Sequence, residues 1–347
     1  GISIVNFKTF KLTVGSFFKM IAPLMYSIVA NKPGDTSVLQ RKSIDLTDLK
    51  SNEILIKNRA IGVNFIDIYF RAGLYPWPVD KDLVLGSEGA GEVEAIGPNV
   101  TKFKIGDRVA YAQPNNAYAT HRMISEDLVV SIPDSISFDQ AAASILKGLT
   151  VKYLVCDSYN LQSNHEVLFH AAAGGVGLIA GQWIKDIGAK LIGTAGNSDK
   201  CELAKQRGFD EVINYSEKNF LDEVLKITNN KGLDVVYDSV GKDTMFQSFK
   251  CLKKHGMLVS FGQSSGPYKD IQMTDLAFGS FYLTRPTLFH FYANREWLEI
   301  ASHKLFEMIV KDKIKLDKIT KYDLDNVADA HTDMENRKTS GSIVLKI

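Results

Sequence analysis

The stretch EVLFHAAAGGVGLIAGQ, residues 166–182, decides the fold of this chain. Its first half is a short apolar run typical of a buried strand, and its second half carries apolar residues at helical spacing. Between them Ala172, Gly174 and Gly177 form an A-x-G-x-x-G loop. Such a loop lets the backbone approach a pyrophosphate, whose charge the first amides and the dipole of the next helix stabilise. The segment predicts a dinucleotide site, with a merely structural glycine turn as the alternative.

The end of the next predicted strand indicates which dinucleotide binds. Sites for NAD place an Asp or Glu about 20 residues after the loop, where it bonds the ribose hydroxyls. Here residues 194–197 read TAGN, and the first acid is Asp199. Lys200, one helical turn in, would pair with a 2′-phosphate. We therefore expect NADPH, and the alternative is that Lys200 is a solvated surface lysine.

Alternating strand and helix patterns surround this loop and predict the α/β class. Repeated βα units imply a doubly wound parallel sheet with right-handed crossovers. The expected strands are 166–172, 190–196, 211–215, 234–240 and 257–262, and the expected helices between them are 176–188, 198–208, 219–230 and 243–255.

The two ends of the chain have a different texture. Short β-rich runs separated by Gly, Pro, Asn and Asp follow residue 25 and predict a compact β domain of the small-barrel kind. Helices are expected at 294–314 and near 325–337, followed by an isolated β segment at 342–347. That last segment suggests that the chain returns to its first domain. The expected domains are a β-rich domain of 25–148 with 287–347, an α/β domain of 149–286, and an extension of 1–24.

Composition and charge narrow the function. The chain has 347 residues and a formal net charge of +1, which gives no global attraction to nucleic acid or anionic lipid. Its three cysteines, Cys156, Cys201 and Cys251, are too far apart for a disulfide framework and favour a reducing compartment, which we take to be the cytoplasm. Residues 1–24 lack acids and a continuous apolar run, so we expect an appended, disordered segment and neither a secretory signal nor a membrane span. A translated upstream region, an added residue at Gly1 and a targeting segment are the alternatives for its origin.

Other patterns carry weaker chemical signals. The seven histidines show no metal-ligand spacing, so no metal site is expected, and Glu88 is read as a structural residue. No G-x-S-x-G elbow supports hydrolysis. The segment NFIDIYFRAGLYPWP, residues 64–78, gathers Asn64, Asp67, Tyr69 and Tyr75 and could wall a planar substrate, although aromatic residues are more often core.

Taken together, these motifs resemble one known family. AIGVNFIDIYFRAGLY, AAASILKGLTVKYL, LFHAAAGGVGLIA, VYDSVG, VSFGQSSG and TRPTL occur in the order found in the zinc-free quinone oxidoreductases of the medium-chain dehydrogenase/reductase family. That group includes zeta-crystallin, and the similarity is greatest to bacterial NADPH:quinone reductases. The resemblance spans nearly all of residues 26–347. It implies a GroES-like β-rich catalytic domain, a Rossmann NADPH-binding domain, and a homodimer joined through the Rossmann edge strand at 280–286.

The same resemblance implies roles for individual residues. Asn64, Asp67 and Tyr69 would lie beside the nicotinamide and its ribose, and Tyr75 would face the quinone. Zinc members of the wider family carry a His in a GHE motif, whereas residues 86–88 here read GSE, so the site is expected to be metal-free. The implied NADPH contacts are Thr150, Gly174, Gly175, Val176, Gly196, Lys200, Tyr215, Ser239, Phe261, Gly262, Gln263 and Arg337.

The function that follows is transfer of a hydride from NADPH to a quinone in a cleft between two domains, which needs no metal because a quinone is already electrophilic. Transfer of single electrons stays open. The alternative enzyme is an enone or alkenal reductase of the same superfamily. The least favoured alternative is an NADPH-binding protein with an RNA-binding role, as reported for some zeta-crystallin relatives. The net charge is only +1 and the sequence has no stripe of basic residues that would attract nucleic acid.

Overall fold

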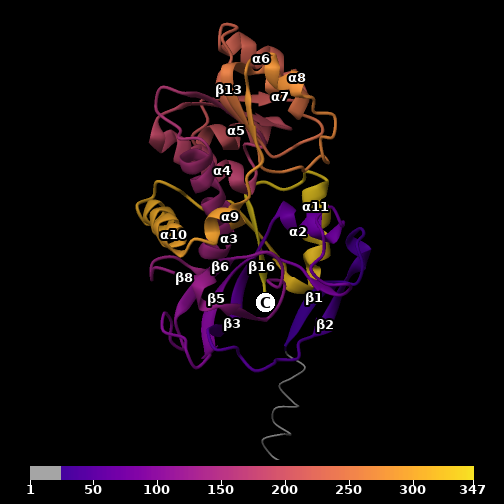
Figure 1. Cartoon of the computed structure of the whole chain (residues 1–347), viewed down its shortest axis with the longest axis vertical. Coiled ribbons are helices and arrows are strands. Elements are labelled where there is room, and N and C mark those ends of the chain that lie inside the picture. Colours follow the sequence, from indigo (N-terminus) through magenta and orange to yellow (C-terminus); the bar gives the residue numbers. More distant parts are fainter. Residues whose placement is uncertain (1–24) are drawn as a thin grey trace, which may run out of the picture.

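Two large sheets stand one above the other along the long axis of the molecule (Figure 1). The computed structural model describes residues 25–347, so the predicted extension 1–24 lies outside the described residues. None of the described helices combines the length and the apolar character needed to cross a bilayer.

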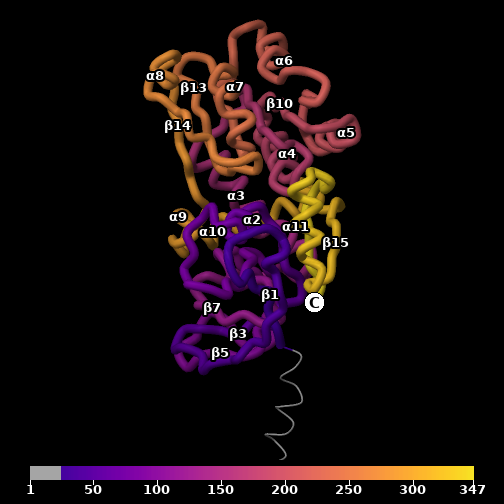
Figure 2. Tube along the Cα trace, turned by 90° about the vertical axis from the view of Figure 1, so that its right-hand side faces the viewer, coloured from indigo at the N-terminus to yellow at the C-terminus, as the bar shows by residue number. Residues whose placement is uncertain are grey.

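The first sheet is built from both ends of the chain. Its order is β15-β16-β3-β5-β6-β8, and β7 also pairs with β3. Because β3 is long, its first half pairs with β7 and its second half pairs with the C-terminal strand β16. Figure 2 shows the yellow C-terminal segment beside the indigo start of the chain. The strands are β3 (Glu53–Val63), β5 (Glu88–Ile96), β6 (Arg108–Ala112), β7 (His121–Ser125), β8 (Val129–Ser131), β15 (Ile319–Asp323) and β16 (Ser342–Lys346).

A small three-stranded sheet, in the order β2-β1-β4, adjoins the first sheet. A backbone hydrogen bond of 2.8 Å from Ile28 N to Tyr118 O ties it there. Its strands are β1 (Tyr26–Ala30), β2 (Leu39–Ser43) and β4 (Leu83–Val84).

The second large sheet is parallel throughout, in the order β11-β10-β9-β12-β13-β14. Successive residues of β9 point to opposite faces: Val167 and Phe169 pack into one hydrophobic cluster and Leu168 into another. Helices therefore cover both faces, and the predicted doubly wound α/β class is confirmed. The strands are β9 (Glu166–Phe169), β10 (Lys190–Ala195), β11 (Glu211–Asn214), β12 (Leu233–Asp238), β13 (Leu252–Ser260) and β14 (Tyr282–Thr284).

The helices that the sequence predicts occur in the expected order, with one clear correction, but the helix over Phe138–Lys152 was not predicted. The helix expected over 243–255 ends at Lys250, because β13 begins at Leu252 and pairs with β12 as an inner strand of the sheet. The sequence pattern also missed strand β15. The helices are α2 (Phe65–Arg71), α3 (Phe138–Lys152), α4 (Gly175–Ile187), α5 (Ser198–Gln206), α6 (Phe220–Ile227), α7 (Met245–Lys250), α8 (Met273–Ala277), α9 (Leu288–Tyr292), α10 (Arg295–Val310) and α11 (Val327–Glu335).

Helix α3 joins the two halves of the molecule. It crosses the predicted boundary at residue 148, and the cluster around it contains Ala60 and Ala90 of the first sheet as well as Val167 of the second. A shared apolar core of this kind holds the halves in register, which fixes the walls of the space between them. The boundaries at 148 and 286 stay predictions.

Candidate active site

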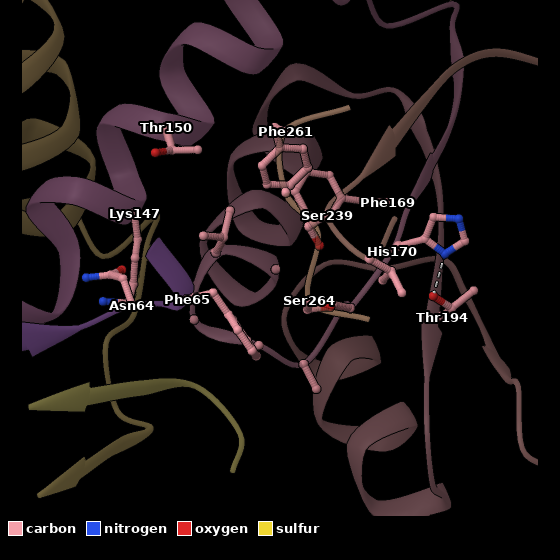
Figure 3. A pocket seen from close by; sticks show the side chains of 18 of the residues that line it. Asn64, Phe65, Lys147, Thr150, Phe169, His170, Thr194, Ser239, Phe261 and Ser264 are labelled. Carbon is pink, nitrogen blue, oxygen red and sulfur yellow. Dashed lines mark hydrogen bonds between the residues drawn. The ribbon is translucent and has the colours of Figure 1, made fainter. Parts of the chain in front are cut away.

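A cavity of about 510 Å³ lies between the two sheets and takes lining residues from both. Most sequence-predicted site residues line it: Asn64, Tyr69, Tyr75, Thr150, Gly174, Gly175, Val176, Gly196, Lys200, Tyr215, Ser239, Phe261, Gly262 and Arg337. Asp67 and Gln263 do not. Figure 3 shows Lys147 and Asn64 together on one side, and His170 with Thr194 on the other. The tertiary structure thus brings residues separated by hundreds of positions to one space.

The glycine loop joins β9 to α4, in the strand, loop and helix order that the sequence predicts. Gly174 is the N-cap of α4, so the first amides of this helix lie next to the cavity. A Cβ at Gly177 would overlap the carbonyl oxygens of Ala171 and Ala172, so the loop can close this tightly only with glycine there. A helix N-terminus with such a loop fits a pyrophosphate.

One end of the cavity concentrates positive charge. The Lys200 Nζ donates a 2.6 Å hydrogen bond to the backbone oxygen of Arg337, and the Arg337 guanidinium donates a 3.1 Å hydrogen bond to Tyr215 Oη. Asp243 lies 3.5 Å from the same guanidinium. Burial and the nearby Arg337 lower the pKa of Lys200. This end offers two cations and a phenol to a phosphate, and residues 194–197 place no carboxylate there.

Helix α2 carries the predicted substrate-side residues. Tyr69 is buried, and its Oη accepts a 2.9 Å hydrogen bond from the backbone N–H of Gln263, which reaches across from the parallel-sheet side. The Tyr69 and Tyr75 rings lie 5.4 Å apart. Since each phenol oxygen accepts from a neighbour, each O–H is left to donate into the cavity.

Asp67 has a different place from the one implied by the resemblance. It is fully buried beneath the cavity wall, and its Oδ2 accepts hydrogen bonds from Asn64 N, at 2.9 Å, and Tyr118 Oη, at 2.7 Å. The bond from Asn64 N caps the start of α2. Within residues 25–347 its Oδ1 has no hydrogen-bond partner. Asp67 therefore holds the helix that carries the site, rather than lining the cavity.

A buried chain of polar groups continues from Asp67 to the C-terminal helix. Arg71 NH1 lies 2.9 Å from His331 Nδ1, and His331 Nε2 lies 2.9 Å from Tyr118 Oη. Because a guanidinium only donates, Nδ1 accepts and Nε2 carries the ring proton. Burial and the Arg71 charge lower the pKa of His331 to about 3, so this ring is neutral. The chain locks α2 to α11.

Comparison with known proteins decides the family. A model described as the alcohol dehydrogenase GroES-like domain matches residues 50–162, and one described as zinc-binding dehydrogenase matches residues 175–305. A quinone oxidoreductase of Pseudomonas aeruginosa is 46% identical over 90% of this chain and 96% of that protein. The chain belongs to the quinone oxidoreductases of the medium-chain dehydrogenase/reductase family.

Two further relatives show the similarity in structure and in sequence. The crystal structure of Escherichia coli quinone oxidoreductase complexed with NADPH matches with a TM-score of 0.90 and 45% identity, over 93% of this chain and 100% of that one. A 2-haloacrylate reductase of a Burkholderia species is 36% identical over 93% of this chain and 99% of that protein. The predicted combination of a GroES-like and a Rossmann-type domain is thereby confirmed.

Sequence reasoning missed an ion pair at the cavity wall of this family member. Glu88, read as structural, is fully buried, and its Oε1 accepts from Lys147 Nζ at 2.7 Å and from Asn64 Nδ2 at 3.0 Å. The other oxygen accepts from Leu146 N at 2.7 Å. Lys147 itself lines the cavity, and its side chain would lie 2.8 Å from a Cβ at Gly175. The spacing between Glu88 and Lys147 gave no signal, because they meet only when α3 packs on β5.

Among the described residues, no group of three or more His, Cys, Asp or Glu side chains is arranged to hold a metal ion.

Arg285 is a second cavity residue that the sequence patterns did not indicate. It follows the edge strand β14, inside the quoted TRPTL motif, and its NH2 donates a 2.8 Å hydrogen bond to Tyr75 Oη. The sequence pattern of this motif did not indicate that its arginine would meet Tyr75, 210 positions away.

Proposed function

We propose that this protein reduces quinones with NADPH, in the cavity between its two sheets. One observation carries the proposal: the glycine loop, the basic group of Lys200 and Arg337, and the aromatic residues of α2 line a single continuous space. A dinucleotide is long enough to reach from the basic end past the loop to the aromatic end. The relatives named as quinone oxidoreductases, one of them complexed with NADPH, support the same reading.

The lining residues fit NADPH on their own chemistry. The tight loop that glycine permits at position 177 brings the first amides of α4 to the cavity, where they suit a pyrophosphate, and Lys200 with Arg337 suits a 2′-phosphate. When bound, NADPH supplies the hydride. We assign Thr150, Ser239, Phe261 and Gly262 to the walls around the nicotinamide half, where Phe261 lies 5.6 Å from Phe169.

The protein's own residues orient the acceptor and provide for its developing charge. We assign Tyr75 the main hydrogen bond to the acceptor oxygen, because Arg285 donates to its oxygen and leaves the phenol proton free to be donated. Burial raises the pKa of Tyr69 and keeps this second phenol protonated. A positioned donor of this kind is worth about 2–4 kcal/mol in a transition state. Aromatic walls exclude water, which strengthens these bonds.

The test measures oxidation of NADPH by a series of ortho- and para-quinones. The reaction is monitored as the loss of NADPH absorbance in the near ultraviolet. We expect turnover with at least one quinone and a marked loss in Tyr75→Phe, with the variant Tyr159→Phe, outside the cavity, as the control. If no quinone is reduced, the proposal is wrong.

The second candidate, reduction of an activated carbon–carbon double bond, is favoured by the similarity to 2-haloacrylate reductase. The same assay with an enone, an alkenal and a haloacrylate separates the two activities. A greater kcat/KM for these acceptors than for any quinone would favour this candidate.

For the assembly, we infer a homodimer through the edge of the parallel sheet. Strand β14 is the edge strand, as predicted for 280–286, and exposed apolar side chains lie on and near it: Met273, Phe278 and Tyr282. Such a patch is commonly covered by a partner. Tyr282→Lys is expected to give monomers in sedimentation, whereas Ile300→Lys, equally exposed on α10, is not.

We also propose a cytoplasmic, reducing location, which the three free cysteines support.

A further inference from the structure

The charges that line the cavity are strongly unequal. Its lining includes one carboxylate, that of Asp243, and five cationic side chains: Lys147, Lys200, Lys218, Arg285 and Arg337. This excess contrasts with a net charge of +1 for the whole chain. A cavity lined by one sign of charge concentrates ligands of the opposite sign. The phosphates of NADPH account for the cations at the basic end, but not for Arg285.

Arg285 lies at the opposite, aromatic end of the cavity. Its two hydrogen bonds go to neutral oxygens, Tyr75 Oη at 2.8 Å and Pro286 O at 2.7 Å. Across residues 25–347, no carboxylate comes within 4.0 Å of its side-chain nitrogens. A guanidinium has five N–H donors, so the charge and several donors of Arg285 are uncommitted.

Lys147, which lies beside the glycine loop, does not behave in the same way as Arg285. Lys147 is buried and is paired with Glu88 at 2.7 Å, so its charge is compensated inside the protein. Arg285 is exposed and lines the cavity together with three uncharged aromatic side chains: Tyr69, Tyr75 and Tyr153. Burial raises the pKa of Tyr153 and keeps that phenol neutral. The aromatic wall is therefore uncharged, and Arg285 adds one uncompensated positive charge to it.

We propose that Arg285 makes this enzyme select electron acceptors that carry an anionic group, a carboxylate or a sulfonate, next to the conjugated ring or double bond that is reduced. This inference rests on the proposed function and names its substrate class. The planar part of the acceptor packs on the aromatic wall, and its anion takes the donors that Arg285 leaves unused, in the two-pronged geometry that guanidinium favours.

The kinetic test compares 1,4-naphthoquinone with 1,4-naphthoquinone-2-sulfonate as acceptors for NADPH. The two differ in intrinsic reactivity, so the ratio of their kcat/KM values is compared between the wild type and Arg285→Gln. We expect the ratio to shift about fivefold against the sulfonate in Arg285→Gln and much less in Arg285→Lys, because the site is exposed and partly screened. Lys304→Gln, an exposed cation outside the cavity, should leave the ratio unchanged. An unchanged ratio in Arg285→Gln overturns the proposal.

A binding test works without turnover. Calorimetry with naphthalene-2-sulfonate and its neutral analogue naphthalene-2-sulfonamide is done on the NADP⁺-loaded wild type and on Arg285→Gln. We expect the sulfonate to bind the wild type about fivefold more tightly than the sulfonamide, and the two to bind Arg285→Gln equally. Equal binding to the wild type overturns the proposal. If the sulfonate is preferred but no quinone is reduced, the anion site stands and the proposed reaction fails.

Discussion

The Nζ atom of Lys147 lies 2.7 Å from Oε1 of Glu88, with both side chains almost wholly buried. Removing water from two charged groups costs several kcal/mol, so a buried ion pair is often no more stabilising than a pair of apolar side chains. The pair connects three parts of the site: α3, the Asn64 amide and the glycine loop. Breaking the pair should measurably lower the stability of the folded protein, because removing one partner leaves the other charge buried without a counter-charge.

Lys147→Met is expected to lower the free energy of unfolding by about 3–5 kcal/mol, measured by denaturant titration. The double variant Lys147→Met with Glu88→Gln should lose less, since no unpaired charge remains. Lys152→Met serves as the control, because Lys152 lies on the same helix and pairs with Asp157 in a more exposed place, and should cost less than about 1 kcal/mol. Equal losses for Lys147→Met and Lys152→Met would contradict the account.

Lys200→Ala is expected to weaken binding of NADPH by about 10- to 100-fold, as the loss of a charge-assisted hydrogen bond implies, and to change binding of NADH much less. The comparison is made by cofactor fluorescence titration. Lys205→Ala, exposed on the same helix and outside the cavity, is the matched control. Equal losses for the two cofactors in Lys200→Ala would make Lys200 a surface residue.

Gly177→Ala and Gly174→Ala should behave differently although both change the same loop. At Gly177 the added methyl group meets two backbone carbonyls, so the loop must shift, and we expect a loss of about 2–3 kcal/mol in stability together with weak NADPH binding. At Gly174 the nearest atom, Ala171 O, is 3.3 Å away, and the cost in stability should stay below about 1 kcal/mol. Thermal unfolding of both variants, without cofactor, distinguishes them. Similar midpoints would show that the loop is not tightly packed.

Asp67 should make stability depend on pH. Burial raises the pKa of Asp67 to about 7, although the hydrogen bonds that it accepts from Asn64 and Tyr118 act in the opposite direction and lower this pKa. The folded state therefore favours the protonated form. This stabilisation is complete below the ordinary aspartate pKa of about 4 and is lost as the pH rises to about 7.

The variant Asp67→Asn mimics the protonated carboxyl group. Relative to the wild type it should be roughly neutral at pH 4 and more stable at pH 8, by up to about 4 kcal/mol. Unfolding curves of both proteins across this range give the difference directly. A difference that does not vary with pH would show that Asp67 does not titrate there.

Features of this protein that depend on neighbouring residues could be predicted from the sequence. The strand, glycine loop and helix of residues 166–187 are local, since the spacing of glycines and apolar residues dictates both the turn and its anion-binding amides. The missing acid in residues 194–197 is equally local, and Lys200 and Tyr215 indeed line the same end of the cavity. The extent of the helix expected over 243–255 was wrong because pairing of β13 with β12 outweighed local helical preference.

Which distant groups meet depends on how the helices and strands pack together. The pairing of Glu88 with Lys147 and that of Tyr75 with Arg285 join residues 59 and 210 positions apart, a separation at which sequence spacing carries no geometric information. The burial of Asp67 also follows from packing, because Tyr118, itself held by His331, reaches it from another part of the chain. Local sequence fixes backbone conformation and the kind of chemistry, whereas burial and charge pairing depend on which elements the folded core brings together.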